Sequence, residues 1–118
     1  MSILRAACVQ MTSGPVMADN LAVAEGLIRR AAGEGARFVA TPEVTCHRMP
    51  DSQEKIRLTP VLQDHPGPVR FAALAHELKV WILAGSFLVR LPSGKLANRS
   101  FLFSDAGVVA ATYDKIHL

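Results

Sequence analysis

The hydrophobic and polar positions change their spacing along the first third of the chain. Residues 3–9 form a short apolar run, which predicts a buried strand. From Asp19 to Gly35 apolar residues recur every three or four positions between charged ones, which predicts an amphipathic helix whose first amides Asp19 and Asn20 can cap. Residues 37–40 form a second apolar run. A strand, a helix and a strand in this order predict a right-handed parallel crossover.

The remaining two thirds begin with a long polar stretch and end in closely spaced apolar runs. Residues 44–66 lack a sustained period apart from a possible helical turn near 51–58, so we expect a long loop, which is typical of a functional segment. Gly67 to Lys79 has the spacing of a second helix. Short glycine-containing turns then join three expected strands of an antiparallel meander, at 80–90, 98–104 and 108–113.

This order of elements predicts an α/β (α+β) fold with a mixed sheet and two main helices. Residues 80–84 are apolar without alternation, so we expect both faces of the central strand to be covered. Two helices can cover one face, and the chain offers no further element for the other. The sequence also stops at 115–118, within what resembles structured sequence. The pattern alone therefore predicts a sheet with one face uncovered.

Composition narrows the classes of protein further. The chain has 118 residues, half of them hydrophobic, which suits one compact domain and argues against intrinsic disorder. The net charge of +3 is scattered, so neither nucleic acid nor a membrane surface is an expected partner. The longest apolar run, 80–89, is too short to span a bilayer as a helix. Two cysteines and the absence of a signal-peptide pattern favour a cytoplasmic location.

The two cysteines and four histidines are candidates for chemistry. No glycine-rich phosphate loop occurs, and His47, His65, His76 and His117 lack metal-ligand spacing, so we expect neither a bound nucleotide nor a metal ion such as zinc. Cys46 precedes His47 directly, which suggests a nucleophile and its base, but neighbours in an extended chain point apart. We expect Cys46 to be a loop thiol at the domain edge, and Cys8 to be a small core residue.

Glu43 and Lys115 are the charged residues whose positions matter most. Glu43 directly follows the strand at 37–40, and the carboxyl ends of parallel strands are where α/β sheets bind ligands. On position alone, such a carboxylate is more often a solvated loop charge or a partner for a helix N-terminus. Lys115 considered by itself is typical of a surface lysine or an ion-pair partner of Asp114.

Five segments of the chain carry recognisable motifs. They are Ala7-Cys8-Val9-Gln10-Met11, Thr41-Pro42-Glu43, Leu83-Ala84-Gly85-Ser86, Asn98-Arg99-Ser100 and Tyr113-Asp114-Lys115-Ile116-His117-Leu118. Taken together and in order along the whole chain, they resemble the amino-terminal half of the nitrilase superfamily, the carbon-nitrogen hydrolases. The run of motifs is most similar to the branch that includes deaminated glutathione amidases and omega-amidases.

The resemblance implies a function and two site residues. Family members hydrolyse small-molecule amides through a Glu-Lys-Cys triad and a thioester, without a cofactor, and commonly form homo-oligomers. Glu43 matches the general base, with a pKa raised by a dry pocket, and Lys115 matches the lysine that stabilises the oxyanion. The loop Val44 to Pro50 would line the acyl pocket. Neither Cys8 nor Cys46 matches the nucleophile, so the resemblance implies a fragment that is inactive alone.

The same resemblance implies a fold. The family domain is a four-layer α-β-β-α sandwich more than twice as long as this chain, and residues 1–118 match its amino-terminal half. Two other functions stay open. The chain could be a non-catalytic interaction domain that binds through an exposed apolar sheet face. Alternatively, Cys46 and His47 could act together in an unrelated thiol hydrolase.

Overall fold

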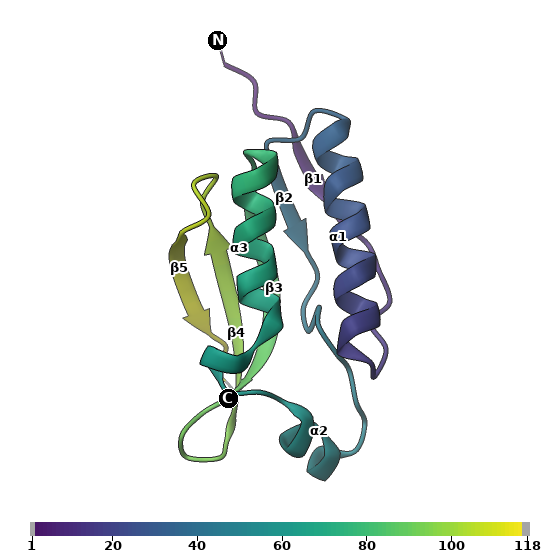
Figure 1. The fold of residues 1–118 in the computed structure, drawn as a ribbon, viewed down its shortest axis with the longest axis vertical. Coiled ribbons are helices and arrows are strands. Elements are labelled where there is room, and N and C mark those ends of the chain that lie inside the picture. Colours follow the sequence, from purple (N-terminus) through teal and green to yellow (C-terminus); the bar gives the residue numbers. More distant parts are fainter. Residues whose placement is uncertain (1, 117–118) are drawn as a thin grey trace.

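One mixed five-stranded sheet, with two long helices against one of its faces, forms the body of the molecule (Figure 1). The structure is a computed structural model and describes residues 2–116. Its strands lie in the order β1-β2-β3-β4-β5. The elements are β1 (Ala6–Cys8), α1 (Met17–Gly33), β2 (Phe38–Thr41), α2 (Ser52–Leu58), the 3-10 turn η1 (Leu62–Asp64), α3 (Pro66–Leu78), β3 (Trp81–Arg90), β4 (Leu96–Phe103) and β5 (Val109–Asp114).

The expected order of strands and helices is confirmed. β1, β2 and β3 are parallel neighbours, and α1 and α3 make the connections between them. β3, β4 and β5 form the antiparallel meander, with an irregularity in β3 between Ala84 and Phe87. The long loop contains α2 at the position where the sequence indicated a helical turn. These parallel strands bring the end of β2 to the same edge of the sheet as the start of β4.

The start of α1 differs from the expectation. The helix begins at Met17, two residues earlier, and Val16 caps it without a side-chain hydrogen bond. The Asn20 side chain instead binds both backbone groups of Gly14 and donates to the Cys46 carbonyl at 2.9 Å. Asn20 is buried within the first turn, so its amide connects two loops rather than capping the helix.

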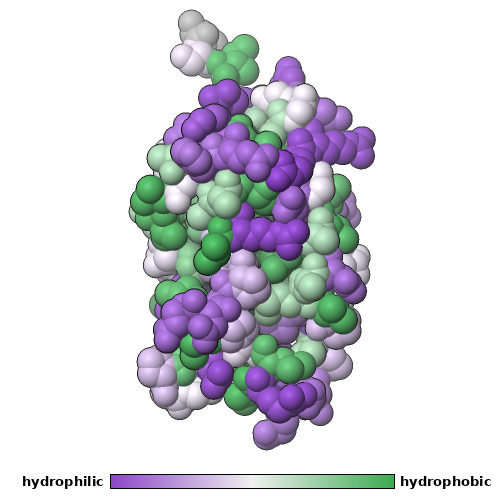
Figure 2. Space-filling view, in the orientation of Figure 1, coloured by the Kyte–Doolittle hydropathy of each residue, from purple (hydrophilic) through white to green (hydrophobic). Residues whose placement is uncertain are grey.

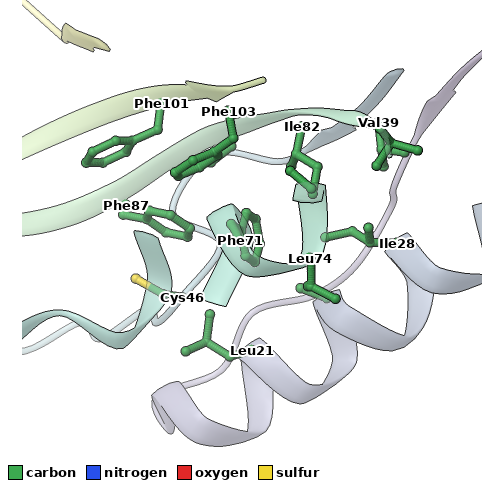
Figure 3. Packing of buried hydrophobic residues seen from close by; sticks show 14 of the residues in the cluster. Leu21, Ile28, Val39, Cys46, Phe71, Leu74, Ile82, Phe87, Phe101 and Phe103 are labelled. Atoms are coloured by element: carbon green, nitrogen blue, oxygen red, sulfur yellow. The ribbon is translucent and has the colours of Figure 1, made fainter. Parts of the chain in front are cut away.

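The core lies between the sheet and the two long helices (Figure 3). Phe71 of α3 meets Phe87 of β3 edge to face with ring centroids 5.0 Å apart, and it meets Phe103 of β4 at 6.2 Å. On α1, Leu21 and Ile28 bury the apolar stripe predicted from their spacing. Burial of such side chains is the main favourable contribution to folding, so this face of the sheet is fixed firmly.

The outer surface of the helices is polar, and ion pairs join α1 to α3. Arg70 of α3 binds Glu25 of α1 at 2.7 Å, and Arg29 of α1 binds Glu77 of α3. Figure 2 views this side and shows hydrophilic residues spread among smaller hydrophobic areas. Among the described residues, no helix is long and apolar enough to cross a membrane.

The opposite face of the sheet is open, as the uninterrupted apolar strand at 80–84 led us to expect. Trp81 of β3 is 38% exposed and Tyr113 of β5 is 59% exposed. Cys8 is exposed as well, so the expectation that it is a core residue was wrong. The reason is the alternation of a strand: Ala7 packs against the core, so Cys8 must point to the other face of β1.

Candidate active site

Glu43 lies just beyond the carboxyl end of β2, in the turn that leads into the long loop. β2 ends at Thr41 and Pro42 separates it from Glu43. The position is the one predicted from the strand pattern, at the edge of the sheet where parallel strands end. The side chain is 54% exposed. The turn therefore presents a carboxylate to the surface instead of burying it.

Two side chains from distant parts of the chain bind the Glu43 carboxylate. Lys115, which follows β5, places Nζ 2.8 Å from Oε1 of Glu43, although the two residues are 72 apart in sequence. Asn98 of β4 donates from Nδ2 to the same oxygen at 2.9 Å. The Lys115 amide also donates to the Asn98 carbonyl at 2.9 Å, which fixes Lys115 beside β4. Three distant segments of the chain thus meet at one carboxylate.

Asn98 is the contact that sequence reasoning missed. It lies within one of the segments that carry the family resemblance, but a role could not be assigned without the strand register. Arg99 pairs with Asp114 across β4 and β5, which brings Asn98 next to Lys115. The Oδ1 atom of Asn98 is buried and has no hydrogen-bond partner among residues 2–116. The register of a hairpin is the signal that could have identified it.

The charge on Glu43 corrects an expectation. The hydrogen bond from Lys115, then that from Asn98, then the Lys115 charge hold the pKa of Glu43 below its usual value, against a smaller opposing effect of desolvation. A raised pKa in a dry pocket was expected. Because the carboxylate is half exposed and paired with an ammonium group, the charged form is favoured instead. Within the described residues, Glu43 is therefore an ionised carboxylate.

A broad depression of about 1130 Å³ adjoins this carboxylate. The loop after Glu43, which was expected to line a pocket, supplies much of its wall, and the loop between β1 and α1, together with α2, β3 and β4, supplies the remainder. Arg48 and Lys55 add two cationic groups to it, beyond the Glu43–Lys115 pair. Its lining is Met11, Thr12, Ser13, Pro42, Glu43, Val44, Arg48, Met49, Pro50, Lys55, Leu88, Leu96 and Asn98. A small molecule entering it would meet Glu43 directly.

Cys46 and His47 are in contact, contrary to the expectation for neighbours in an extended chain. The loop turns there, and Cys46 Sγ lies 3.4 Å from His47 Nδ1 and 3.7 Å from His65 Nε2. Thr59 donates its hydroxyl to the Lys55 carbonyl at 2.5 Å, so its oxygen accepts from His47 Nε2 at 3.1 Å. His47 Nδ1 is then the acceptor for the Cys46 thiol.

This thiol is buried in the core and not at the domain edge where it was expected. Cys46 is fully buried, and desolvation raises the pKa of its thiol to about 11. His65 beside it binds the Gly67 amide through Nδ1 and donates from Nε2 to the Leu88 carbonyl, both at 3.0 Å. Every polar atom of the cluster is occupied, and a protonated buried thiol is a poor nucleophile. The cluster anchors the long loop to β3.

Nothing in the described part of the chain assembles a metal centre. Between residues 2 and 116, no group of three histidine, cysteine, aspartate or glutamate side chains is arranged to hold a metal ion. His117 and Leu118, which complete the last segment of the resemblance, lie outside the described residues.

Known proteins are similar to this chain in sequence and in fold. The family model for carbon-nitrogen hydrolases matches residues 5–118. The chain is 33% identical over 127 aligned residues to the omega-amidase NIT2 of Danio rerio, with all of this chain and 42% of that protein covered. It is 33% identical over 115 residues to the deaminated glutathione amidase of a Synechocystis strain, covering 96% of this chain and again 42% of the relative.

Solved structures of the superfamily superpose on the same region. The NitFhit protein of Caenorhabditis elegans matches with a TM-score of 0.85 and 26% identity, over 94% of this chain and 27% of that one. Saccharomyces cerevisiae Nit3, described as a member of branch 10 of the nitrilase superfamily, matches with a TM-score of 0.81 and 24% identity, over 97% and 44% respectively. The chain spans less than half the length of these relatives. By sequence over nearly its whole length, and by fold, it belongs to the carbon-nitrogen hydrolase family.

Proposed function

We propose that the protein containing this chain is an amidase that hydrolyses a non-peptide carbon–nitrogen bond, with Glu43 as general base and Lys115 as the group that stabilises the oxyanion. The observation that carries the proposal is the 2.8 Å contact between Lys115 Nζ and Glu43 Oε1. It joins residues 72 apart, and it lies beside a depression large enough for a small ligand. The relatives named omega-amidase and deaminated glutathione amidase support a small-molecule amide as substrate.

The two groups suit complementary steps of amide hydrolysis. An ionised Glu43 can take the proton of a cysteine thiol, and the thiolate then attacks the amide carbon. The Lys115 ammonium faces the oxygen that becomes negative. As the carbon–nitrogen bond breaks, Glu43 returns the proton to the leaving nitrogen, and a thioester remains. Glu43 next accepts a proton from water, whose oxygen attacks the thioester; the carboxylic acid leaves and the thiol regains its proton.

The nucleophile of this scheme is expected outside the 118 residues. Cys46 is buried and protonated, and Cys8 lies on β1 in a segment that does not match the family nucleophile. The chain covers 42% of the curated relatives described above, which leaves room for a further strand and a cysteine. We propose that residues 1–118 are one part of the domain, inactive alone, and that the remainder covers the open sheet face. Cytoplasmic location and homo-oligomer formation are proposed for the complete protein.

Ammonia release from a panel of primary amides tests this proposal. The protein encoded by the complete reading frame is expected to release ammonia, and the 118-residue chain is expected to release none. In the complete protein, Lys115→Met is expected to lower kcat by roughly 10²–10³-fold, because the oxyanion loses its cation. Lys95→Met, in an exposed turn between β3 and β4, is the matched control. Hydrolysis by the isolated chain, or an active Lys115→Met variant, would refute the assignment.

The open sheet face favours a second candidate function, that of a non-catalytic interaction domain. Trp81 and Tyr113 are exposed on this side, and such apolar surfaces bind other proteins. The complete reading frame separates the two functions. If it ends at Leu118, or continues without a cysteine after a further strand, the interaction domain is favoured over the amidase.

A further inference from the structure

The turn that carries Glu43 contains an unusual backbone conformation. Val44 has φ 53°, in the left-handed region. Among the described residues other than glycine, Lys79 also has a positive φ. Lys79 ends α3 in an ordinary left-handed cap. A β-branched side chain strongly disfavours this region, because its Cβ crowds the following carbonyl. The surrounding structure must therefore hold Val44 in place.

Ser86 supplies that restraint with two hydrogen bonds to consecutive amides. The Val44 amide donates to the Ser86 hydroxyl at 2.8 Å, and the Thr45 amide donates to the Ser86 carbonyl at 3.0 Å. Ser86 is 3% exposed, so little water competes for either acceptor. On the far side of the turn, the Ser13 hydroxyl donates to the Thr45 carbonyl at 2.9 Å. Both amides that follow Glu43 are thus bound to one residue of β3.

The position of Ser86 in the strand explains how one residue reaches both amides. The register of β3 with β4 shifts between Ala84 and Phe87, which places Gly85 and Ser86 in an irregular step. Such a step bends a strand and redirects its side chains. The sequence already singled out Gly85 and Ser86 within a segment of the family resemblance, without a role in chemistry. The structure gives Ser86 a place next to the Glu43 turn.

We propose that Ser86 is a positioning residue: by holding Val44 in its left-handed conformation, it directs the Glu43 carboxylate toward Lys115 and Asn98. Without the hydroxyl, Val44 relaxes toward the ordinary β region, and the side chain of Glu43 moves away from its two partners. The catalytic consequence of this movement rests on the proposed amidase function. The geometric part does not, since it concerns contacts that lie within this chain.

A pH titration of Glu43 tests the geometric part directly. The carboxyl carbon of Glu43 is followed by nuclear magnetic resonance in the 118-residue chain and in Ser86→Ala. The Lys115 and Asn98 contacts lower the pKa of Glu43, so Ser86→Ala is expected to shift it upward toward the 4.5 of an ordinary glutamate. Ser100→Ala is the control, because the Ser100 hydroxyl binds the Gly85 carbonyl at 2.7 Å and does not contact the amides of residues 44 and 45. The titration of Glu43 in Ser100→Ala is expected to match that in the unaltered chain.

A second substitution separates positioning from general loosening. Glycine adopts positive φ without a steric cost. When Val44→Gly is combined with Ser86→Ala, the pKa of Glu43 is therefore expected to fall part of the way back toward its value in the unaltered chain. An unchanged Glu43 titration in Ser86→Ala, or a double variant no different from Ser86→Ala, would overturn the proposal. Should Ser86→Ala not fold, amide exchange in the unaltered chain decides: slow exchange at Val44 and Thr45 supports the proposal, and exchange at the rate of a free peptide at either residue refutes it.

Activity then separates this inference from the proposed function. In the complete protein, Ser86→Ala is expected to lower kcat with KM nearly unchanged, and to move the acidic limb of the pH profile upward. If the titration shifts as expected but no amide is hydrolysed by the unaltered protein, the proposed function fails and the role of Ser86 in positioning Glu43 stands.

Discussion

Gly85 of β3 lies directly against the backbone that leads into the Glu43 turn. A Cβ added at this glycine would be 2.4 Å from the Thr41 carbonyl oxygen and 2.5 Å from the carbonyl carbon of Pro42. Both are backbone atoms, which cannot rotate away as a side chain can. Gly85→Ala must therefore push β3 and the Glu43 turn apart.

The change in stability caused by Gly85→Ala can be compared with that of the same substitution at Gly26, a glycine with no close neighbours. Overpacking of this kind costs about 1–3 kcal/mol of unfolding free energy, and we expect Gly85→Ala in the upper part of that range because the clash is with backbone. Gly26 lies within α1, and an added Cβ there meets nothing within 4 Å. Gly26→Ala should therefore stabilise the chain by about 0.5–1 kcal/mol, since alanine favours a helix over glycine.

Urea unfolding of the two variants, followed by the fluorescence of Trp81, measures this difference. Trp81 is the single tryptophan and lies on β3, so its signal reports the strand in question. Low protein concentrations keep association through the open face from distorting the transition. The reasoning is refuted if Gly85→Ala is as stable as the unaltered chain, or if Gly26→Ala destabilises it.

Three further predictions concern the buried cluster and the open face. A thiol reagent at pH 8 should label Cys8 quickly and Cys46 only on unfolding, since burial raises the pKa of Cys46 to about 11; prompt labelling of both would contradict this. Burial lowers the pKa of His65 to about 4, so the unfolded chain binds more protons and stability should fall as pH drops from about 6.5 to 4; a flat urea-midpoint profile would count against it. Ultracentrifugation of the 118-residue chain should show association through the open face, and a stable monomer would be contrary evidence.

Local patterns were sufficient to predict most of the fold. The spacing of Leu21 and Ile28 predicted α1, and the apolar run at 80–84 predicted both β3 and an uncovered sheet face. Cys8 was misplaced because an apolar run of small residues does not reveal which face of an edge strand is covered. Composition alone cannot decide between the two faces.

The candidate site was predicted less completely, because it depends on contacts between distant segments. The strand end and the resemblance located Glu43, but its partner Asn98 follows from the hairpin register. The contact between Cys46 and His47 depends on how a loop turns, and the left-handed Val44 depends on hydrogen bonds that loop amides donate to Ser86 of β3. The expected rise in the pKa of Glu43 assumed a dry environment, which residues 2–116 do not provide.

The proposed role of Glu43 as general base is tested most directly by kcat/KM for amide hydrolysis in the complete protein carrying Glu43→Gln. A general base contributes about 10²–10⁴-fold, so the variant is expected to lose activity by that factor while it keeps its fold. Glu54→Gln removes a carboxylate that is exposed and paired with Arg57 at 2.8 Å, and it is expected to retain full activity. Equal kcat/KM for Glu43→Gln and the unaltered protein would contradict the account.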